Sequence, residues 1–163
     1  MAPPVPGGHV PALVLTGGGA RSAYQVGVLK AVAELLPEQR NPFPVILGTS
    51  AGAVAASVLG ARANDWHQAV AAIEHVWANF HVGQVFHVSR RKMLRAGVRW
   101  MLSLLSGGLL VRAPRSLFDN TPLRQLLTRE VRWRGVGRNV RAGNLAALAL
   151  CATGYGTARS VAY

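Results

Sequence analysis

Acidic side chains are scarce in this sequence. Its 163 residues include 18 Lys and Arg, 16 of them Arg, but only 6 Asp and Glu, which gives a formal charge of +12 at pH 7. Such an excess predicts attraction to anionic surfaces: phospholipid, nucleic acid or acidic substrates. A compositional bias toward Arg without functional meaning is the alternative interpretation.

Cysteine and clustered histidine are lacking as well. Cys151 is the single cysteine, so no disulfide forms within the chain, and no Cys/His pair has zinc-ligand spacing. No H-E-x-x-H occurs either, so the histidines are interpreted as ordinary helix or loop residues. The sequence therefore predicts neither a metal site nor a cofactor. The scattered histidines are His9, His67, His75, His81 and His87.

Long apolar runs are missing too. The N-terminus has no basic region, and the first apolar run is short and broken by Pro11. The longest apolar stretch, residues 100–111, is too short to span a bilayer. Residues 1–9, rich in Pro and Gly, predict a flexible leader to a single domain over residues 10–163. We expect a cytoplasmic protein that can also contact a membrane surface.

What the sequence does contain is a serine between a strand pattern and a helix pattern. A short apolar run ends in Gly48-Thr49-Ser50-Ala51-Gly52, and an Ala-rich helical run follows at once. A nucleophile elbow, a strained strand-to-helix turn with serine at its apex, needs small residues two before and two after the serine. Gly48 and Gly52 meet that need. A plain small-residue turn is the alternative.

A second glycine-rich turn comes earlier. Residues 12–15 form a short apolar run typical of a buried parallel strand, and Thr16-Gly17-Gly18-Gly19 follow directly. Apolar residues then recur at helical spacing until Pro37. Three glycines bring bare N–H groups to the start of this helix, which predicts an anion site.

Two anions fit this loop. A dinucleotide pyrophosphate needs a third glycine where Ser22 stands, and an acid at the end of the second strand, where none occurs. The oxyanion of acyl transfer fits better. Neighbouring parallel strands bring both turns to one edge of the sheet, so the glycine loop would face Ser50.

These motifs resemble those of the patatin-like phospholipase family, in a bacterial style. The resemblance rests on residues 13–29 and 48–52, and extends to residues 116–123 and 145–163. It implies an α/β fold of three layers, α/β/α, with a mainly parallel sheet. It also implies a lipid acyl hydrolase that uses a Ser–Asp dyad on phospholipid or other lipid esters, without a metal.

The resemblance carries roles to particular residues. Ser50 takes the nucleophile position, Gly48 and Gly52 flank it, and Arg21 takes the position of the loop's basic residue. Ser22 stands where the family usually has Gly, and it either tightens the loop or points to solvent. The implied oxyanion hole consists of the backbone N–H groups of Gly17, Gly18, Gly19 and Ala51.

The catalytic base is missing. The family's aspartate lies in an Asp-Gly motif, and this sequence contains no Asp-Gly. Asp65 and Asp119 are interpreted as helix caps or anchors. A Ser–Asp–His triad through Asp65 is disfavoured, since His67 lies only two residues away. We therefore expect residues 10–163 to be the N-terminal portion of a patatin-like domain, nearly inactive alone. The alternatives are a non-catalytic fragment or pseudoenzyme that binds lipid surfaces and, less favoured, a nucleotide-binding Rossmann-type domain.

The middle of the chain adds two basic segments. Residues 66–80 predict a helix on one face of the sheet. Residues 89–111, basic and then apolar, predict either an interfacial flap or a core helix with an Arg edge. Residues 128–141 interleave Arg with Trp133, which fits nucleic-acid binding, but no nucleic-acid motif accompanies them and a solvated loop is favoured.

Overall fold

The computed structural model describes residues 10–36, 40–79, 121–154, 157 and 159–163, together with Leu94, Val98 and Met101. The chain divides into two compact units, residues 1–79 with 130–163, and residues 80–129. The first unit holds the sheet and both glycine-rich turns. It is described first and by itself.

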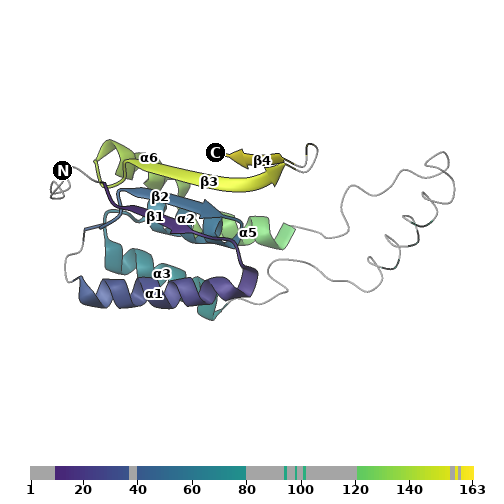
Figure 1. Cartoon of the computed structure of the whole chain (residues 1–163), viewed down its shortest axis with the longest axis horizontal. Coiled ribbons are helices and arrows are strands. Elements are labelled where there is room, and N and C mark those ends of the chain that lie inside the picture. Colours follow the sequence, from purple (N-terminus) through teal and green to yellow (C-terminus); the bar gives the residue numbers. More distant parts are fainter. Residues whose placement is uncertain are drawn as a thin grey trace. The chain divides into compact units, whose positions relative to one another are not determined.

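Three parallel strands and one antiparallel strand form the sheet (Figure 1). The strands are β1 (Ala12–Leu15), β2 (Val45–Thr49), β3 (Ala147–Gly154) and β4 (Arg159–Ala162), in the order β1-β2-β3-β4. Leu15 pairs with Gly48, and Thr49 pairs with Cys151. The carboxyl ends of β1 and β2 therefore lie side by side, so the two turns that follow them leave the sheet at the same edge.

The helices of this unit pack on the sheet and on one another. They are η1 (Gly19–Arg21), α1 (Ser22–Leu35), α2 (Ala51–Ala61), α3 (Trp66–Ala78) and α6 (Trp133–Arg141). α2 lies on β1, β2 and β3, because its small apolar residues allow a close approach. The main packing partners of α3 are α1 and α2. α3 therefore lies with α1 and α2 on one face of the sheet, as the sequence predicts.

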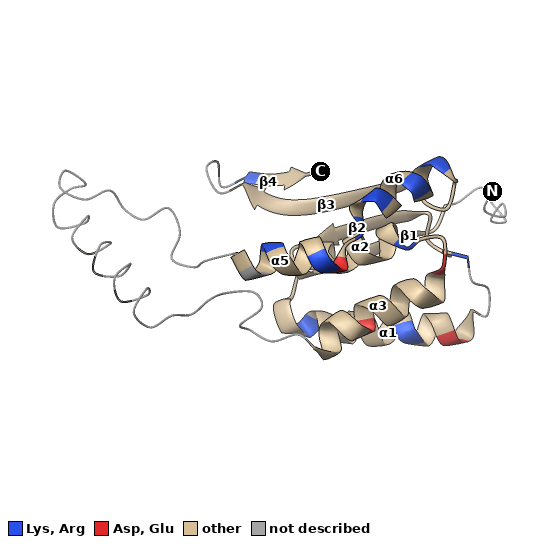
Figure 2. Cartoon of the chain, turned by 180° about the vertical axis from the view of Figure 1, so that it is seen from behind, with Lys and Arg blue, Asp and Glu red and all other residues tan. Residues whose placement is uncertain are grey.

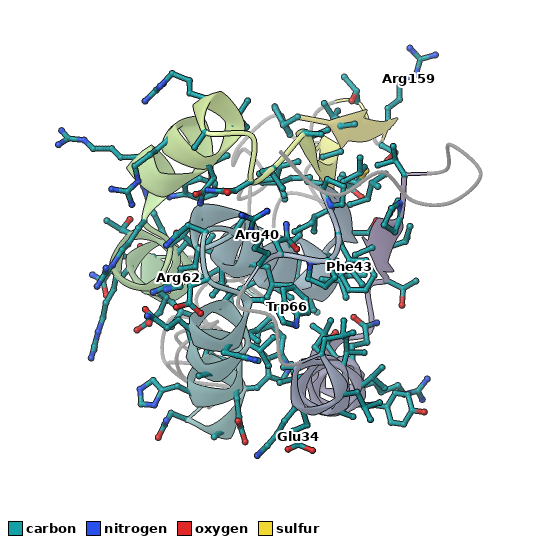
Figure 3. The ribbon with its side chains drawn as sticks, turned by 90° about the vertical axis from the view of Figure 1, so that its left-hand side faces the viewer. Glu34, Arg40, Phe43, Arg62, Trp66 and Arg159 are labelled. Atoms are coloured by element: carbon teal, nitrogen blue, oxygen red, sulfur yellow. The ribbon has the colours of Figure 1, made fainter. Side chains whose placement is uncertain are left out.

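The core lies between the sheet and these helices. Ile46 of β2 and Ile73 of α3 are fully buried, and Trp66 is 1% exposed. The Phe43 ring meets the Trp66 indole edge to face at 5.5 Å between ring centroids (Figure 3). The segment that leads into β2 is thus fixed to the start of α3, which anchors β2 before it reaches its turn.

The predicted α/β fold with a mainly parallel sheet is confirmed. In this unit the helices lie on one face of the sheet, while on the other face Ala12 and Ala147 are exposed and Val14 is 65% exposed. Consecutive strands that advance in one direction with right-handed crossovers put their helices on the same face. The second helical layer of the prediction is not among the elements of this unit.

The prediction of a solvated loop over residues 128–141 is wrong. α5 (Thr121–Glu130) and α6 cover almost all of this segment. The buried positions at helical spacing are Val131, Gly135 and Asn139, and only the first is a large apolar residue. A hydrophobicity pattern therefore does not detect the buried face of this helix. The Arg residues of α6 lie on its exposed side (Figure 2).

The remaining elements agree with the sequence where they can be compared. The expected strand and hairpin over residues 145–163 are present as β3 and β4, and a helix begins beside Pro122 as expected. The leader, Asp119 and most of the segment 89–111 lie outside the described residues.

Candidate active site

Ser50 occupies a strained turn between β2 and α2. Its φ is 54° and its ψ is −119°, and in the described part of the chain it is the only non-glycine residue with positive φ. Such a conformation costs about 1–3 kcal/mol and persists only where the surroundings enforce it. Its backbone N–H donates to the carbonyl oxygen of Cys151 at 3.2 Å, so β3 holds the turn in place. The side chain is exposed at the edge of the sheet.

Two glycines make room for this turn. A Cβ on Gly52 would overlap the carbonyl oxygen of Leu15, and a Cβ on Gly48 would overlap the carbonyl oxygen of Gly52. The obstacles are backbone atoms, which cannot rotate away. β1, β2 and α2 therefore meet at a distance that only glycine permits at both positions, as an elbow requires.

The glycine loop lies against the serine. A Cβ placed on Gly17 would be 3.1 Å from the Cβ of Ser50 and 3.8 Å from its Oγ. Gly18 has φ 178°, which is extended backbone, whereas Gly19 has φ 55° in the left-handed region. The sequence expectation that the two turns meet at one edge is thus realised in space.

The donors around Ser50 are unused. Within the described residues, the backbone N–H groups of Gly17, Gly18 and Ala51 donate to no backbone carbonyl. The first N–H groups of a helix have no partner within the helix, and the helix dipole adds positive potential at that end. Amides without a backbone acceptor, close to an exposed hydroxyl, can donate hydrogen bonds to a substrate oxygen on which negative charge develops.

Arg21 and Ser22 follow the loop and differ in exposure. Arg21 ends η1 and is exposed. Ser22 is only 1% exposed, and its Oγ has no hydrogen-bond partner. The alternative in which Ser22 points to solvent is therefore wrong. The loop packs over its side chain, because a Cβ on Gly18 would lie 3.9 Å from the Ser22 Oγ.

One contact of the loop was not anticipated from the sequence. The side-chain Nε2 of Gln25 donates to the carbonyl oxygen of Thr16 at 3.1 Å and to its Oγ1 at 2.7 Å. Gln25 lies on α1, nine residues after Thr16, and nothing in the spacing alone signals this pairing. The end of β1 is therefore tied to the first turns of α1.

Asp65 is not placed to act as a base for Ser50. Its Oδ1 accepts from the backbone N–H of Gln68 at 3.0 Å and its Oδ2 accepts from Nε2 of the same residue at 2.9 Å. This N-cap role at the start of α3 confirms the sequence prediction. α2 has 11 residues and so separates Asp65 from the turn by ~16 Å. A triad through Asp65 is excluded by this separation.

The described residues contain no group of three His, Cys, Asp or Glu side chains that could hold a metal ion. Cys151 is a free, half-buried thiol. No helix in the described ranges is both long and apolar enough to cross a lipid bilayer.

A serine at an elbow on a parallel sheet, with a glycine loop beside it, is the arrangement by which α/β serine hydrolases carry out acyl transfer. Comparison with family models matches residues 13–157 to the patatin-like phospholipase family. The chain belongs to that family, whose members hydrolyse lipid esters. Searches of curated protein sequences and of solved structures gave no match.

Proposed function

We propose that this chain carries the nucleophile and the oxyanion hole of a serine-dependent lipid acyl hydrolase. Ser50 is the nucleophile, and the backbone N–H groups of Gly17–Gly19 and Ala51 hold the oxyanion. The observation that carries the proposal is the close approach of Gly17 to the Ser50 side chain, which is exposed on a turn with positive φ.

The proposed chemistry has two steps. The Ser50 oxygen forms a bond to the acyl carbon while its proton passes to a base, and the carbonyl oxygen takes a negative charge that the loop amides stabilise. Collapse of this intermediate expels the alcohol, which takes the proton. Water, activated by the same base, then releases the carboxylic acid from the serine.

The base in this proposal is an aspartate of the family's Asp-Gly motif, which this sequence does not contain. General-base assistance contributes roughly 10²–10⁴-fold to such a step. We therefore expect the chain by itself to turn over lipid esters slowly or not at all, although Ser50 remains the site of covalent attack. Arg21 is proposed as a basic residue at the rim of the site.

We further propose that the substrate is a phospholipid or another lipid ester and that the protein reaches it at an anionic membrane surface. The net charge of +12 supports that contact, since each basic residue near an anionic surface adds ~1 kcal/mol. Nucleic acid is not a proposed partner. Co-sedimentation with phosphatidylglycerol vesicles, lost in 0.5 M salt and absent with phosphatidylcholine, is the expected result.

Labelling with a fluorophosphonate probe tests the catalytic assignment. Because the base is absent, we expect slow labelling that reaches one label per chain at high probe concentration, located at Ser50 by peptide mass spectrometry and abolished in Ser50→Ala. Ser160→Ala, at an exposed serine of β4, is the matched control and keeps full labelling. A label elsewhere, or none at high probe concentration, would contradict the proposal.

The alternative is a protein of the same fold that binds lipid surfaces without catalysis. It predicts vesicle binding with no label at Ser50, so the two experiments separate it from the hydrolase. A dinucleotide that raised the melting temperature would instead favour a nucleotide site in the glycine loop.

A further inference from the structure

We propose that Gln25 is a positioning residue for the oxyanion loop. Its side-chain amide holds the Thr16 carbonyl and thereby fixes the direction of the Gly17 N–H beside Ser50. This inference rests on the proposed function of the loop and names the residue that keeps the loop ready for it.

The assignment of the contact follows from its partners. A carbonyl oxygen can only accept, so the atom of Gln25 that faces the Thr16 oxygen must be the amino nitrogen. The same Nε2 reaches the Thr16 hydroxyl at 2.7 Å and the Thr16 carbonyl at 3.1 Å. One side chain thus binds both polar groups of the residue that precedes the glycines.

The peptide plane transmits this contact to the loop. The Thr16 carbonyl and the Gly17 N–H belong to one planar trans peptide unit, so they point in opposite directions. With the carbonyl held on the α1 side, the N–H of Gly17 is turned away from α1. Gly17 is also the loop glycine that approaches Ser50, with a Cβ placed there lying 3.8 Å from the serine Oγ.

Glycine makes such a restraint necessary. Gly17, Gly18 and Gly19 have wide conformational freedom, and the N–H groups of the first two donate to no carbonyl in the described part of the chain. A donor must already point at the oxyanion when charge develops, because reorganisation at that moment removes its benefit. The Gln25 amide is the side-chain contact that limits this freedom at the N-terminal end of the loop.

Gln25 at this position lowers the stability of the fold, so stability alone does not account for it, which favours a functional role. The Oε1 of Gln25 is buried and has no hydrogen-bond partner. A buried acceptor without a partner is unfavourable, and an apolar side chain of the same length would avoid it. Gln25 leaves its Oε1 without a partner, while its Nε2 makes both hydrogen bonds to Thr16.

Gln25→Met in the full chain tests the proposal, because Met has similar length and cannot donate. We expect the backbone ¹⁵N order parameters of Gly17 and Gly18 to fall from about 0.85 to below about 0.6. We expect fluorophosphonate labelling of Ser50 to slow by about tenfold, a fraction of the 10²–10³ lost when a whole oxyanion donor is removed. Gln68→Met, which removes another Gln side-chain bond at the start of α3, changes neither quantity.

Two further variants keep the test sharp if Gln25→Met folds poorly. Thr16→Val removes the hydroxyl partner and leaves the carbonyl, so a smaller slowing of two- to threefold is expected. Gln25→Glu can donate only when protonated, so its loop order is expected to be near normal at pH 4 and lost at pH 7. A merely structural role would show no such pH dependence in the loop.

The outcomes are distinguishable from failure of the proposed function. If wild-type Ser50 takes no label, the hydrolase assignment fails, and the order parameters still decide whether Gln25 restrains the loop. If Gln25→Met folds with unchanged order parameters and labels within twofold of wild type, the positioning role is overturned.

Discussion

The two ends of α2 differ in backbone strain, in exposure and in hydrogen bonding. At the N-terminal end, Ser50 has a strained backbone, its side chain is exposed, and the N–H of Ala51 donates to no backbone carbonyl within the described residues. At the C-terminal end, Gly60 and Ala61 are buried where α2 packs on α6, and the Gly60 carbonyl accepts a hydrogen bond from Asn139. One helix therefore joins a strained, exposed end to a packed end.

The packed end is built from close backbone contact and specific hydrogen bonds. A Cβ on Gly135 would overlap the carbonyl oxygen of Ala61, and the side chain of buried Asn139 donates to the carbonyl of Gly60 at 3.1 Å. Arg62 Nη1 donates to the carbonyl of Glu130 at 3.1 Å. Burial lowers the pKa of the Arg62 guanidinium, and nearby Arg132 lowers it further.

The comparison shows where the unit can tolerate strain. Unpaired amides and a positive φ each cost free energy, and a net stability of a few kcal/mol cannot absorb many such costs. The well-packed end of α2 holds the helix in position while its other end stays unsatisfied. Changes at the two ends should therefore differ in size, with the larger loss of stability at the packed end.

The largest effect is expected at the packed end. Gly135→Ala places a methyl group against the Ala61 backbone and should destabilise the protein by roughly 3 kcal/mol or more, or prevent folding. Gly27→Ala is the matched control, since it also lies within a helix and nothing is within 4 Å of its Cβ position. That variant should be stabilised by about 0.5–1 kcal/mol. Urea unfolding measures both, and equal midpoints would contradict the packing.

The next effect belongs to the strained end. Ser50→Gly accepts the positive φ without strain, so it should be more stable than Ser50→Ala by about 1 kcal/mol. Both variants should lose the fluorophosphonate label. Thermal unfolding of the pair isolates the backbone strain, and a Ser50→Ala variant at least as stable as Ser50→Gly would show that the turn is unstrained.

A smaller difference is expected between two buried serines. Ser22 and Ser57 are 1% and 2% exposed, but the Ser57 Oγ donates to the Ala53 carbonyl at 2.7 Å while the Ser22 Oγ has no partner. Ser57→Ala should lose about 0.5–1 kcal/mol, whereas Ser22→Ala should be neutral or stabilising by up to about 1 kcal/mol. If Ser22→Ala is the less stable of the two, the Ser22 hydroxyl has a partner in solution.

The smallest effect is expected far from both ends of α2. Lys30 Nζ lies 2.7 Å from Glu74 Oε1, and this hydrogen bond raises the pKa of Lys30 above 10.5. A raised lysine pKa stabilises the fold below the unfolded-state pKa and stops doing so as the pH rises past the folded-state pKa. Lys30→Met should therefore have a slightly lower Tm than wild type at pH 8, and the difference should vanish as the pH rises past the folded-state pKa of Lys30, or in 1 M salt. A difference that persists there would point to packing by the lysine stem instead.

Much of this unit could be predicted because its signals are local. The run of residues 12–15, the Gly48–Gly52 pattern and the Asp65 cap each depend on neighbours in the sequence, and the structure has β1, the turn and the cap where they were expected. The role of α6 could not be predicted in this way. Its buried stripe includes Gly135 and Asn139, which mark a close contact and a hydrogen bond that exist only once α2 lies beside it.

The sequence by itself determined the two strand–turn–helix units at the start of the chain, the position of the serine in its turn, and the absence of an Asp-Gly motif. These follow from periodicity and from the backbone limits of glycine, which act over a few residues. Tertiary structure alone decided that Gln25 binds Thr16, that Ser22 is buried, and that Gly135 and Asn139 of α6 contact the end of α2. Such contacts depend on how each helix packs against its neighbours in space, which local sequence patterns do not encode.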